Sequence, residues 1–317
     1  MFSFKLNRLC TALLLLSCLG VQVISAGPVV SPIQSYKKLE RRDGDRREYA
    51  SMTLQNKLQT LLVHDETAKR AAIVLTYRDG QYNDHGIPGL HHWAEHACFT
   101  GSGLWQWAAQ NGGKCSATTM HQSTVYDFAV PDKAFESAVI KMRDMFLDPQ
   151  SKIYVAASQV PIIQHEYEER MCLRGPLLHE IGKEVLLPDI PAHLNSCGNE
   201  VTLTSLHAKQ ALKELLGRYT PDHMQLVIVS SRSLNNMRDI VADAFSILRA
   251  SSPVCRQGSV LPKLIEDRSA RRRYRLGQSV KAKSFEKEPA MKMTFLIPDA
   301  FQSLVTLFLV FICCYSV

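Results

Sequence analysis

His92, Glu95 and His96 have the residue types and the spacing that hydrolytic metal chemistry requires. Residues i and i+4 lie on one face of an α-helix, so both imidazoles can bind one metal ion. Glu95 follows three residues after His92, on the same side of the helix. Its carboxylate can there take a proton from a metal-bound water. His91 points about 100° away from His92, and we expect it to pack or to face solvent.

The residues before this motif predict a strand and a loop that lead into its helix. Residues 52–54 and 58–63 flank a Gln-Asn-Lys turn and predict a hairpin. The β-branched run 71–77 has the length of a buried strand. Pro88 suits the first turn of a helix, and it follows a loop formed by Asp79, Gly80, Asn83, Asp84 and Gly86. We therefore expect the metal motif on a helix entered from a strand and a loop.

The rest of the chain mixes strands and helices without strict alternation. Apolar residues at helical spacing predict helices, and short β-branched runs predict strands. The predicted helices cover residues 104–110, 132–147, 155–172, 203–216 and 234–248, and the predicted strands cover residues 115–119, 123–130 and 224–230. We therefore expect an α+β fold with helices packed on one face of a mixed β-sheet. Residues 48–250 are expected to form one catalytic domain.

Composition and charge indicate a globular protein and argue against a nucleic-acid binder. The chain has 317 residues, of which 46% are hydrophobic, and a formal net charge of +7. Basic residues concentrate in residues 37–47 and 268–275, and only Tyr274 accompanies the second run. A nucleic-acid surface would interleave basic with aromatic side chains. We interpret both runs as solvated linkers and expect no nucleic-acid partner.

Residues 1–26 have the layout of a secretory signal peptide. Lys5 and Arg8 precede an apolar stretch, residues 10–19, that is too short to span a bilayer. A small residue at the end of the segment suits cleavage. We therefore expect entry into the secretory pathway and a secreted or lumenal protein. Residues 27–47 are polar and charged, and we expect them to form a linker.

The C-terminal part of the sequence predicts a second linker and the start of another domain. Residues 251–290 contain prolines, glycines and an arginine run, and residues 291–317 begin with a strand-like stretch. Residues 301–317 are nearly all apolar, but their length is at the short limit for a membrane helix. Membrane association, a lipid-anchor signal and an abnormal end of the reading frame are the alternatives for this tail. We favour the last, because the polar spacer of an anchor signal is missing.

The residues around the metal motif resemble a known family of peptidases. Residues 89–96, followed by Phe99, Gly101 and Ser102, resemble the zinc-site segment of the insulysin/pitrilysin family, which are inverzincin metallopeptidases. Other segments resemble the family in the same order, over about residues 45–300. They are residues 47–49, 53–54, 61–64, 112–113, 117–119, 197–199, 202–203 and 224–230. The resemblance implies a zinc-dependent peptidase with the family's αβ sandwich.

The resemblance also implies the third metal ligand. In the family it is a glutamate on a later helix, and the matching position here is Glu166. The rivals on composition alone are Glu168, Glu169 and Glu180. Two imidazoles and one carboxylate leave the fourth position of zinc for water. We therefore expect Glu95 to be the general base and the zinc ligands to be His92, His96 and Glu166.

The expected substrate is a peptide that binds as an added strand on a sheet edge. In the family this strand runs beside the site, and the matching residues are Ser116, Ala117 and Thr118. Main-chain pairing gives affinity with little demand on sequence. Ser116 stands where many members of the family have an asparagine that holds the substrate backbone. The predicted substrate class is therefore peptides or small unfolded proteins.

Several departures from the family leave a second interpretation open. Gln159 stands where the family usually has another glutamate, and Pro161 is expected to kink the helix of Glu166. The family closes a chamber from two halves, so a second subunit or half is an expected partner. We favour a secreted zinc metalloendopeptidase. The alternatives are a truncated or non-catalytic member that binds peptides or a partner subunit, and a helical protein whose histidine pair is structural.

Overall fold

The computed structural model describes residues 31–250, except for residues 174, 179 and 182–195. The described residues from Pro32 onward belong to one compact unit. The predicted signal peptide 1–26, the predicted linker 251–290 and residues 291–317 lie outside the described residues. Within the described part, no helix has the length and apolarity that crossing a membrane requires.

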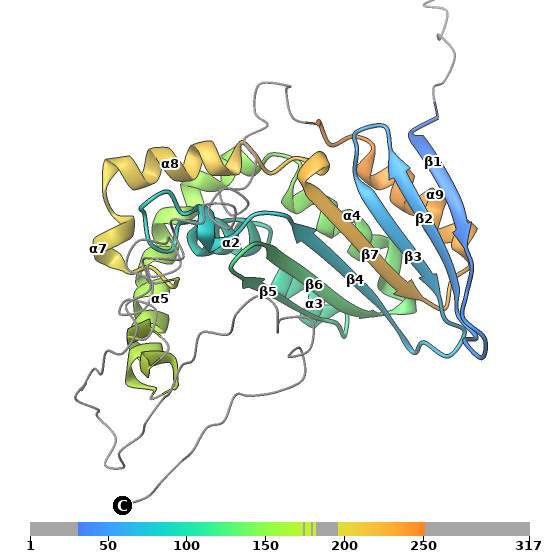
Figure 1. Cartoon of the computed structure of the whole chain (residues 1–317), viewed down its shortest axis with the longest axis horizontal. Coiled ribbons are helices and arrows are strands. Elements are labelled where there is room, and N and C mark those ends of the chain that lie inside the picture. Colours follow the sequence, from blue (N-terminus) through green and yellow to red (C-terminus); the bar gives the residue numbers. More distant parts are fainter. Residues whose placement is uncertain (1–30, 174, 179, 182–195, 251–317) are drawn as a thin grey trace, which may run out of the picture. The chain divides into compact units, whose positions relative to one another are not determined.

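Seven strands of the described chain form one mixed sheet (Figure 1). Their order across the sheet is β1-β2-β3-β7-β4-β6-β5, which places β5 at an edge. β3 and β7 pair in parallel, and all other neighbours pair antiparallel. The strands are β1 (Ile33–Leu39), β2 (Glu48–Leu54), β3 (Gln59–His64), β4 (Arg70–Tyr77), β5 (Lys114–Thr119), β6 (Thr124–Pro131) and β7 (Met224–Ser230).

The predicted hairpin is confirmed, whereas β1 was not expected. β2 and β3 pair antiparallel on either side of the predicted turn. β1 lies within the segment 27–47 that we expected to be a linker, and it pairs with β2 from Ile33 opposite Leu54 to Leu39 opposite Tyr49. Most of its side chains are exposed. An edge strand with charged, solvated side chains shows little apolar alternation, so the sequence pattern did not indicate it.

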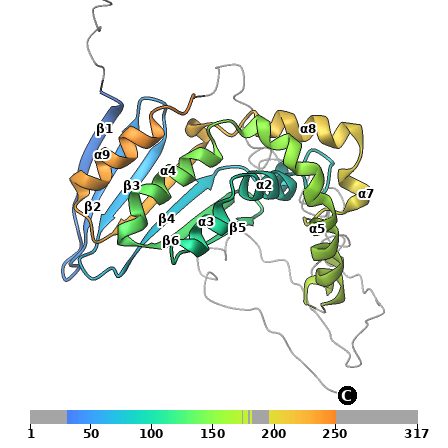
Figure 2. The same ribbon diagram turned by 180° about the vertical axis from the view of Figure 1, so that it is seen from behind.

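Helices cover one face of this sheet, and the expected α+β class is confirmed. Figure 2 shows α3, α4 and α9 lying across the sheet, with α5, α7 and α8 beyond α2. The helices are α2 (Leu90–Gly101), α3 (Leu104–Gln110), α4 (Phe135–Met145), α5 (Ile153–Cys172), α7 (Glu200–Leu203), α8 (Leu206–Leu216) and α9 (Leu234–Phe245). The metal motif therefore lies on α2, entered from β4 through a loop as predicted.

The helix that carries the motif is fixed by its buried face. α2 buries Trp93, Ala94 and Cys98 in the core. The indole N–H of Trp93 donates to the carbonyl of Ala156 on α5 over 2.8 Å. Removing a buried tryptophan side chain costs about 3–5 kcal/mol. This contact therefore holds α2 against the helix that carries Glu166.

α5 presents Glu166 to α2 as the continuation of its buried face. Gln159 and Ile163 are buried, and Glu166 follows at helical spacing. Pro161 lies inside the helix and removes one main-chain hydrogen bond, yet the chain stays helical from Ile153 to Cys172. The proline therefore leaves Glu166 on the same helix as the buried contacts that position it.

Candidate metal centre

His92, His96 and Glu166 bring three ligand atoms to one point. The two Nε2 atoms lie 3.1 Å apart, and Glu166 Oε2 lies 3.3 Å from Nε2 of His92 and 3.5 Å from Nε2 of His96. Ligand atoms at about 2.0–2.2 Å from a tetrahedral zinc ion are about 3.3–3.6 Å from one another. All three distances are close to this range. The donor set and its spacing therefore fit a zinc ion.

Other glutamates that the sequence offered as ligands lie elsewhere. Among the described residues, the cluster able to hold a metal contains Glu166 and neither Glu168, Glu169 nor Glu180. Glu168 accepts a hydrogen bond from Gln164 over 2.7 Å, and Glu169 lies 3.4 Å from His165. Both side chains are on the solvated side of α5. The helix geometry thus separates one inward carboxylate from its exposed neighbours.

The orientation of His92 is set by a backbone group. Its Nδ1 donates to the carbonyl of Cys197 over 2.7 Å, which leaves Nε2 as the atom facing the other ligands. Burial lowers the pKa of His92, but the hydrogen bonds to Cys197 and Glu166 outweigh burial and raise it to about 10. Hydrogen bonds from His92 and His96 hold the pKa of Glu166 below its usual range. Metal uptake at these groups is therefore coupled to proton release.

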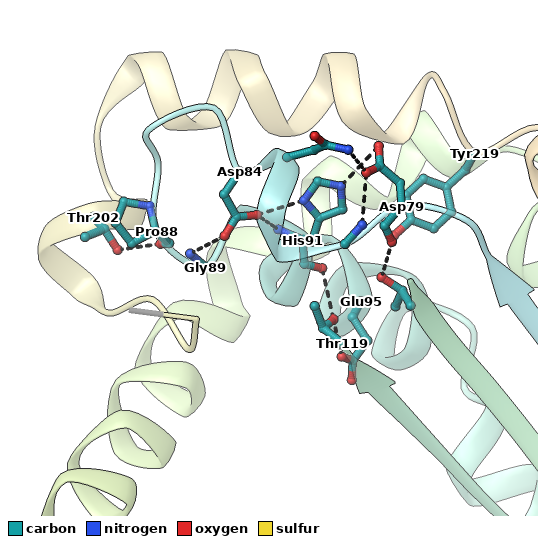
Figure 3. A network of polar contacts seen from close by, with 12 residues as sticks. Asp79, Asp84, Pro88, Gly89, His91, Glu95, Thr119, Thr202 and Tyr219 are labelled. Atoms are coloured by element: carbon teal, nitrogen blue, oxygen red, sulfur yellow. Dashed lines mark hydrogen bonds and ion pairs between the residues drawn. The ribbon is translucent and has the colours of Figure 1, made fainter. Parts of the chain in front are cut away.

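Glu95 lies in the same cavity as the three ligands but is held by a different partner. Thr119 on β5 donates its hydroxyl to Glu95 Oε2 over 2.6 Å (Figure 3). The Glu95 side chain is buried. The cavity has a volume of about 470 Å³, and its lining includes Glu95, His92, His96 and Glu166. A carboxylate fixed beside the ligand set, but outside it, has the position of a general base.

The strand predicted to bind substrate lies along this cavity, but only two of its three predicted substrate-binding residues line it. Ala117 and Thr118 line the cavity together with Thr119. Ser116 is exposed and absent from the lining, and its hydroxyl donates to Asp127 on the neighbouring strand β6. β5 is an edge strand of the described sheet. The main chain of β5 is thus placed to pair with an extended peptide, whereas the Ser116 side chain is engaged elsewhere.

The buried His91 belongs to a network that sequence reasoning missed (Figure 3). Asp84 Oδ1 accepts from the main-chain N–H of His91 over 2.9 Å and from its Nδ1 over 2.7 Å. Asp84 Oδ2 accepts from the N–H of Gly89 over 2.9 Å. Asp79 Oδ2 lies 3.5 Å from His91 Nε2. The expectation that His91 packs is confirmed, and the two aspartates, seen in the sequence only as loop residues, anchor the start of α2.

The loop at Cys197 holds the same end of α2 from another side. A Cβ atom added to Gly89 would lie 2.3 Å from Gly198 Cα, so the two backbones approach as closely as glycine allows. Thr202 donates its hydroxyl to the carbonyl of Pro88 over 3.0 Å. This contact places Cys197 beside His92. The sequence pointed to residues 197–199 as similar to the family but assigned them no role.

Gln159 occupies a buried position between the two ligand-bearing helices. Its Oε1 accepts from the hydroxyl of Thr100 on α2 over 3.0 Å, and 4% of its surface is exposed. A neutral amide can both accept and donate here, whereas a carboxylate could only accept. The glutamine therefore links α2 with α5 without adding charge to the centre.

Comparison with known proteins shows that the chain is similar to one family of peptidases. The Insulinase (Peptidase family M16) profile matches residues 59–181, which include the three ligands and Glu95. The Arabidopsis thaliana protein named insulin-degrading enzyme-like 1, peroxisomal, is 25% identical over 228 residues, which are 66% of this chain and 23% of that protein. The chain thus spans about a quarter of the length of such relatives. The resemblance seen in the sequence is confirmed.

Solved structures agree with this placement. Pitrilysin superimposes with a TM-score of 0.63 at 25% identity, over 68% of this chain and 25% of that one. The first half of the periplasmic protease PqqL from Escherichia coli gives a TM-score of 0.57 at 15% identity, over 70% of this chain and 50% of that one. At 15% identity, the match to PqqL shows a shared fold and nothing more. The described domain thus has the fold seen in such proteases.

Proposed function

We propose that the chain is a zinc-dependent metalloendopeptidase of the insulinase type (family M16), to which it is similar, and that it hydrolyses peptides or small unfolded proteins. The observation that carries the proposal is the approach of His92, His96 and Glu166 to 3.1–3.5 Å of one another beside Glu95. Zinc, when bound by the three, lowers the pKa of its water towards neutrality and polarises the carbonyl of the scissile bond.

Glu95 would carry the proton in this reaction. Its carboxylate takes the proton of the attacking water and passes it to the leaving amine. The hydroxyl of Thr119 holds one carboxylate oxygen over 2.6 Å, and burial keeps the side chain from turning into solvent. Because Thr119 lies on the strand that would bind substrate, the base and the peptide are positioned by the same element.

β5 would bind the peptide through its main chain. The strand pairs with β6 on one side, and its other edge is free of described strands. An extended peptide added there gains main-chain hydrogen bonds with little demand on sequence. Ala117 and Thr118 lie along the cavity and would contact the residues next to the scissile bond. Ser116, expected to bind substrate, would contribute its main chain.

Two substitutions test the proposal on the purified chain. The wild type is expected to bind about one zinc ion and to cleave an unstructured peptide. His96→Ala is expected to lose the zinc, because two ligands remain. Glu95→Gln is expected to keep the zinc and lose cleavage. Absence of zinc from the wild type, or cleavage by Glu95→Gln, would overturn the assignment.

A second candidate function is a truncated or non-catalytic member that binds peptides or a partner subunit. The observation that favours it is the engaged side chain of Ser116, whose hydroxyl bonds to Asp127 and does not line the cavity. The first half of the periplasmic protease PqqL has a similar fold, so a domain of this fold can form one half of a larger protease. A chain that binds zinc and peptide but cleaves only after a second subunit or half is added would support this alternative.

We also propose that the protein enters the secretory pathway. The support is the sequence pattern of residues 1–26, in which basic residues precede a short apolar stretch. Expression in a eukaryotic cell with a C-terminal tag tests the proposal. A secreted or lumenal product whose N-terminus is Gly27 is expected, and a cytosolic product that keeps Met1 would refute it.

A further inference from the structure

A second cavity lies between α3 and the first residues of β5, apart from the metal centre. It has a volume of about 280 Å³ and is lined by Trp105, Ala108, Ala109, Gly113, Lys114 and Cys115. None of these residues lines the cavity of the metal centre. A water molecule occupies about 30 Å³ of liquid volume, so the space is large enough for one bulky side chain.

The walls of this cavity are mostly apolar and held in place. Trp105 exposes 65% of its surface, and a single exposed aromatic needs no explanation unless a cavity lies beside it. The N–H of Gly113 donates to the carbonyl of Ala108 over 2.7 Å. A Cβ atom on Gly113 would come within 2.9 Å of Val130. The end of α3 is thus packed tightly against β5, and the space between them is preformed.

The register of β5 connects this cavity with the metal centre. Cys115 and Ala117 both pack against the core, and Thr119, which reaches Glu95, lies on the same face because side chains alternate along a strand. Cys115 precedes Ala117 by two positions and Thr119 by four. A peptide paired with β5 alternates in the same way. Its side chains at this cavity are therefore two or four positions from the residue at the metal centre.

We propose that the cavity beside Trp105 is a specificity subsite for a large apolar side chain, preferably aromatic, of the peptide bound on β5. The inference rests on the proposed peptidase function, because it requires a peptide on that strand. An aromatic ring can stack on the exposed indole, while the methyl groups of Ala108 and Ala109 surround its edge. The subsite lets an enzyme with main-chain recognition select among sequences.

The polar groups at this cavity are consistent with an apolar occupant. Burial raises the pKa of the Cys115 thiol to about 11, with Asp127 adding to the effect. The thiol is therefore neutral at pH 7 and forms an apolar wall. Lys114 is exposed at the rim, and its ammonium group disfavours a lysine or arginine side chain in the same space.

Binding of matched peptides tests the subsite without turnover. The zinc-loaded Glu95→Gln chain is titrated with two fluorescent peptides of polar sequence that differ only by one phenylalanine or one serine. The phenylalanine peptide is expected to bind about tenfold more tightly or better. Trp105→Ala and Ala109→Leu change exposed positions of α3. Each is expected to bring the ratio of the dissociation constants of the serine and phenylalanine peptides close to one. Gln106→Ala, on the same helix and outside the cavity, is expected to leave it unchanged.

The outcomes separate this inference from the function on which it rests. If neither peptide binds, the peptidase proposal and the subsite both fail. If both bind and the ratio is the same in Ala109→Leu as in the parent chain, the subsite alone is refuted. Cleavage mapping of the phenylalanine peptide by the wild type adds a second check. Phenylalanine is expected two or four positions from the residue held at the metal centre, and a neighbouring or three-residue spacing would overturn the register argument.

Discussion

His92 donates its Nδ1–H to the carbonyl of Cys197, which lies 105 positions later in the sequence. The bond fixes which imidazole nitrogen faces the other ligands. The carbonyl is held in place because Gly198 packs against Gly89 at the start of α2. A distant loop thus orients the first ligand of the centre, and this relationship can be tested by disturbing the glycine contact.

Gly198→Ala is expected to weaken zinc binding about 10- to 100-fold, as loss of an outer partner of a metal ligand usually does. The added Cβ atom would lie 2.8 Å from the carbonyl oxygen of Pro88 and 2.9 Å from Gly89 Cα, so the loop must move away from His92. Competition with a chromophoric chelator measures the affinity. Gly86→Ala is the matched control, since Gly86 also has a positive φ but open space around it. Equal affinities of the two variants would contradict the role of the loop.

Thr119→Val is expected to lower kcat/KM about tenfold or more while zinc content stays unchanged. The substitution keeps the shape of the side chain but removes the hydroxyl that holds Glu95 over 2.6 Å. A hydrogen bond to a charged group contributes about 1.5–3 kcal/mol. Thr100→Val is the control, because it removes a hydroxyl bonded to Gln159 and not to Glu95. A similar loss in both variants would show that Thr119 has no special role in positioning the base.

The buried His91 is expected to make stability depend on pH. Burial lowers its pKa, but hydrogen bonds and charges of Asp79 and Asp84 outweigh burial and raise it from 6.5 to about 9. Because the protonated His91 is favoured in the fold, its contribution to stability is fully present below pH 6.5 and is lost as the pH rises through 9. A pKa shift of one unit corresponds to about 1.4 kcal/mol, so the raised pKa of His91 contributes about 3 kcal/mol to the free energy of unfolding.

Urea unfolding of the metal-free chain at pH 6 and pH 10 measures this effect. The difference in unfolding free energy between the wild type and His91→Gln is expected to be about 3 kcal/mol smaller at pH 10. His207→Gln, at an exposed position of α8, is expected to show no such change. A difference for His91→Gln that is the same at both pH values would mean that the imidazole is not charged in the fold.

The sequence predicted those parts of the centre that depend on local spacing. The positions i and i+4 on a predicted helix were sufficient to place His92 and His96 together. The loop and Pro88 before the motif indicated α2, and periodicity identified α5 to within a few residues. Glu166 comes from a separate helix, and only the resemblance to a family selected it among neighbouring glutamates. The structure now brings its carboxylate to 3.3 Å from His92.

Other parts of the centre carry no signal in residue type. The partner of His92 is a main-chain carbonyl, which every residue has, so Cys197 was not distinguishable in this role. Asp79 and Asp84 read as loop residues because aspartate favours turns, although both face the buried His91. The sequence pattern did not indicate β1, because an exposed edge strand lacks apolar alternation. These features depend on packing between residues that are far apart in the sequence, so a short segment of sequence does not indicate them.

Zinc is expected to raise the melting temperature of the chain by about 10 °C when its free concentration is about 1,000 times the Kd, since such binding stabilises by about 4 kcal/mol. Glu166→Gln is expected to lose most of this gain, because a neutral amide replaces the carboxylate that lies 3.3 and 3.5 Å from the two imidazoles. Glu168→Gln, two residues further along α5 and bonded to Gln164 on the exposed side, is expected to keep it. Thermal unfolding with zinc and with a chelator measures both variants. An equal zinc-induced gain in the two would remove Glu166 from the ligand set, because only the inward carboxylate can respond to the ion.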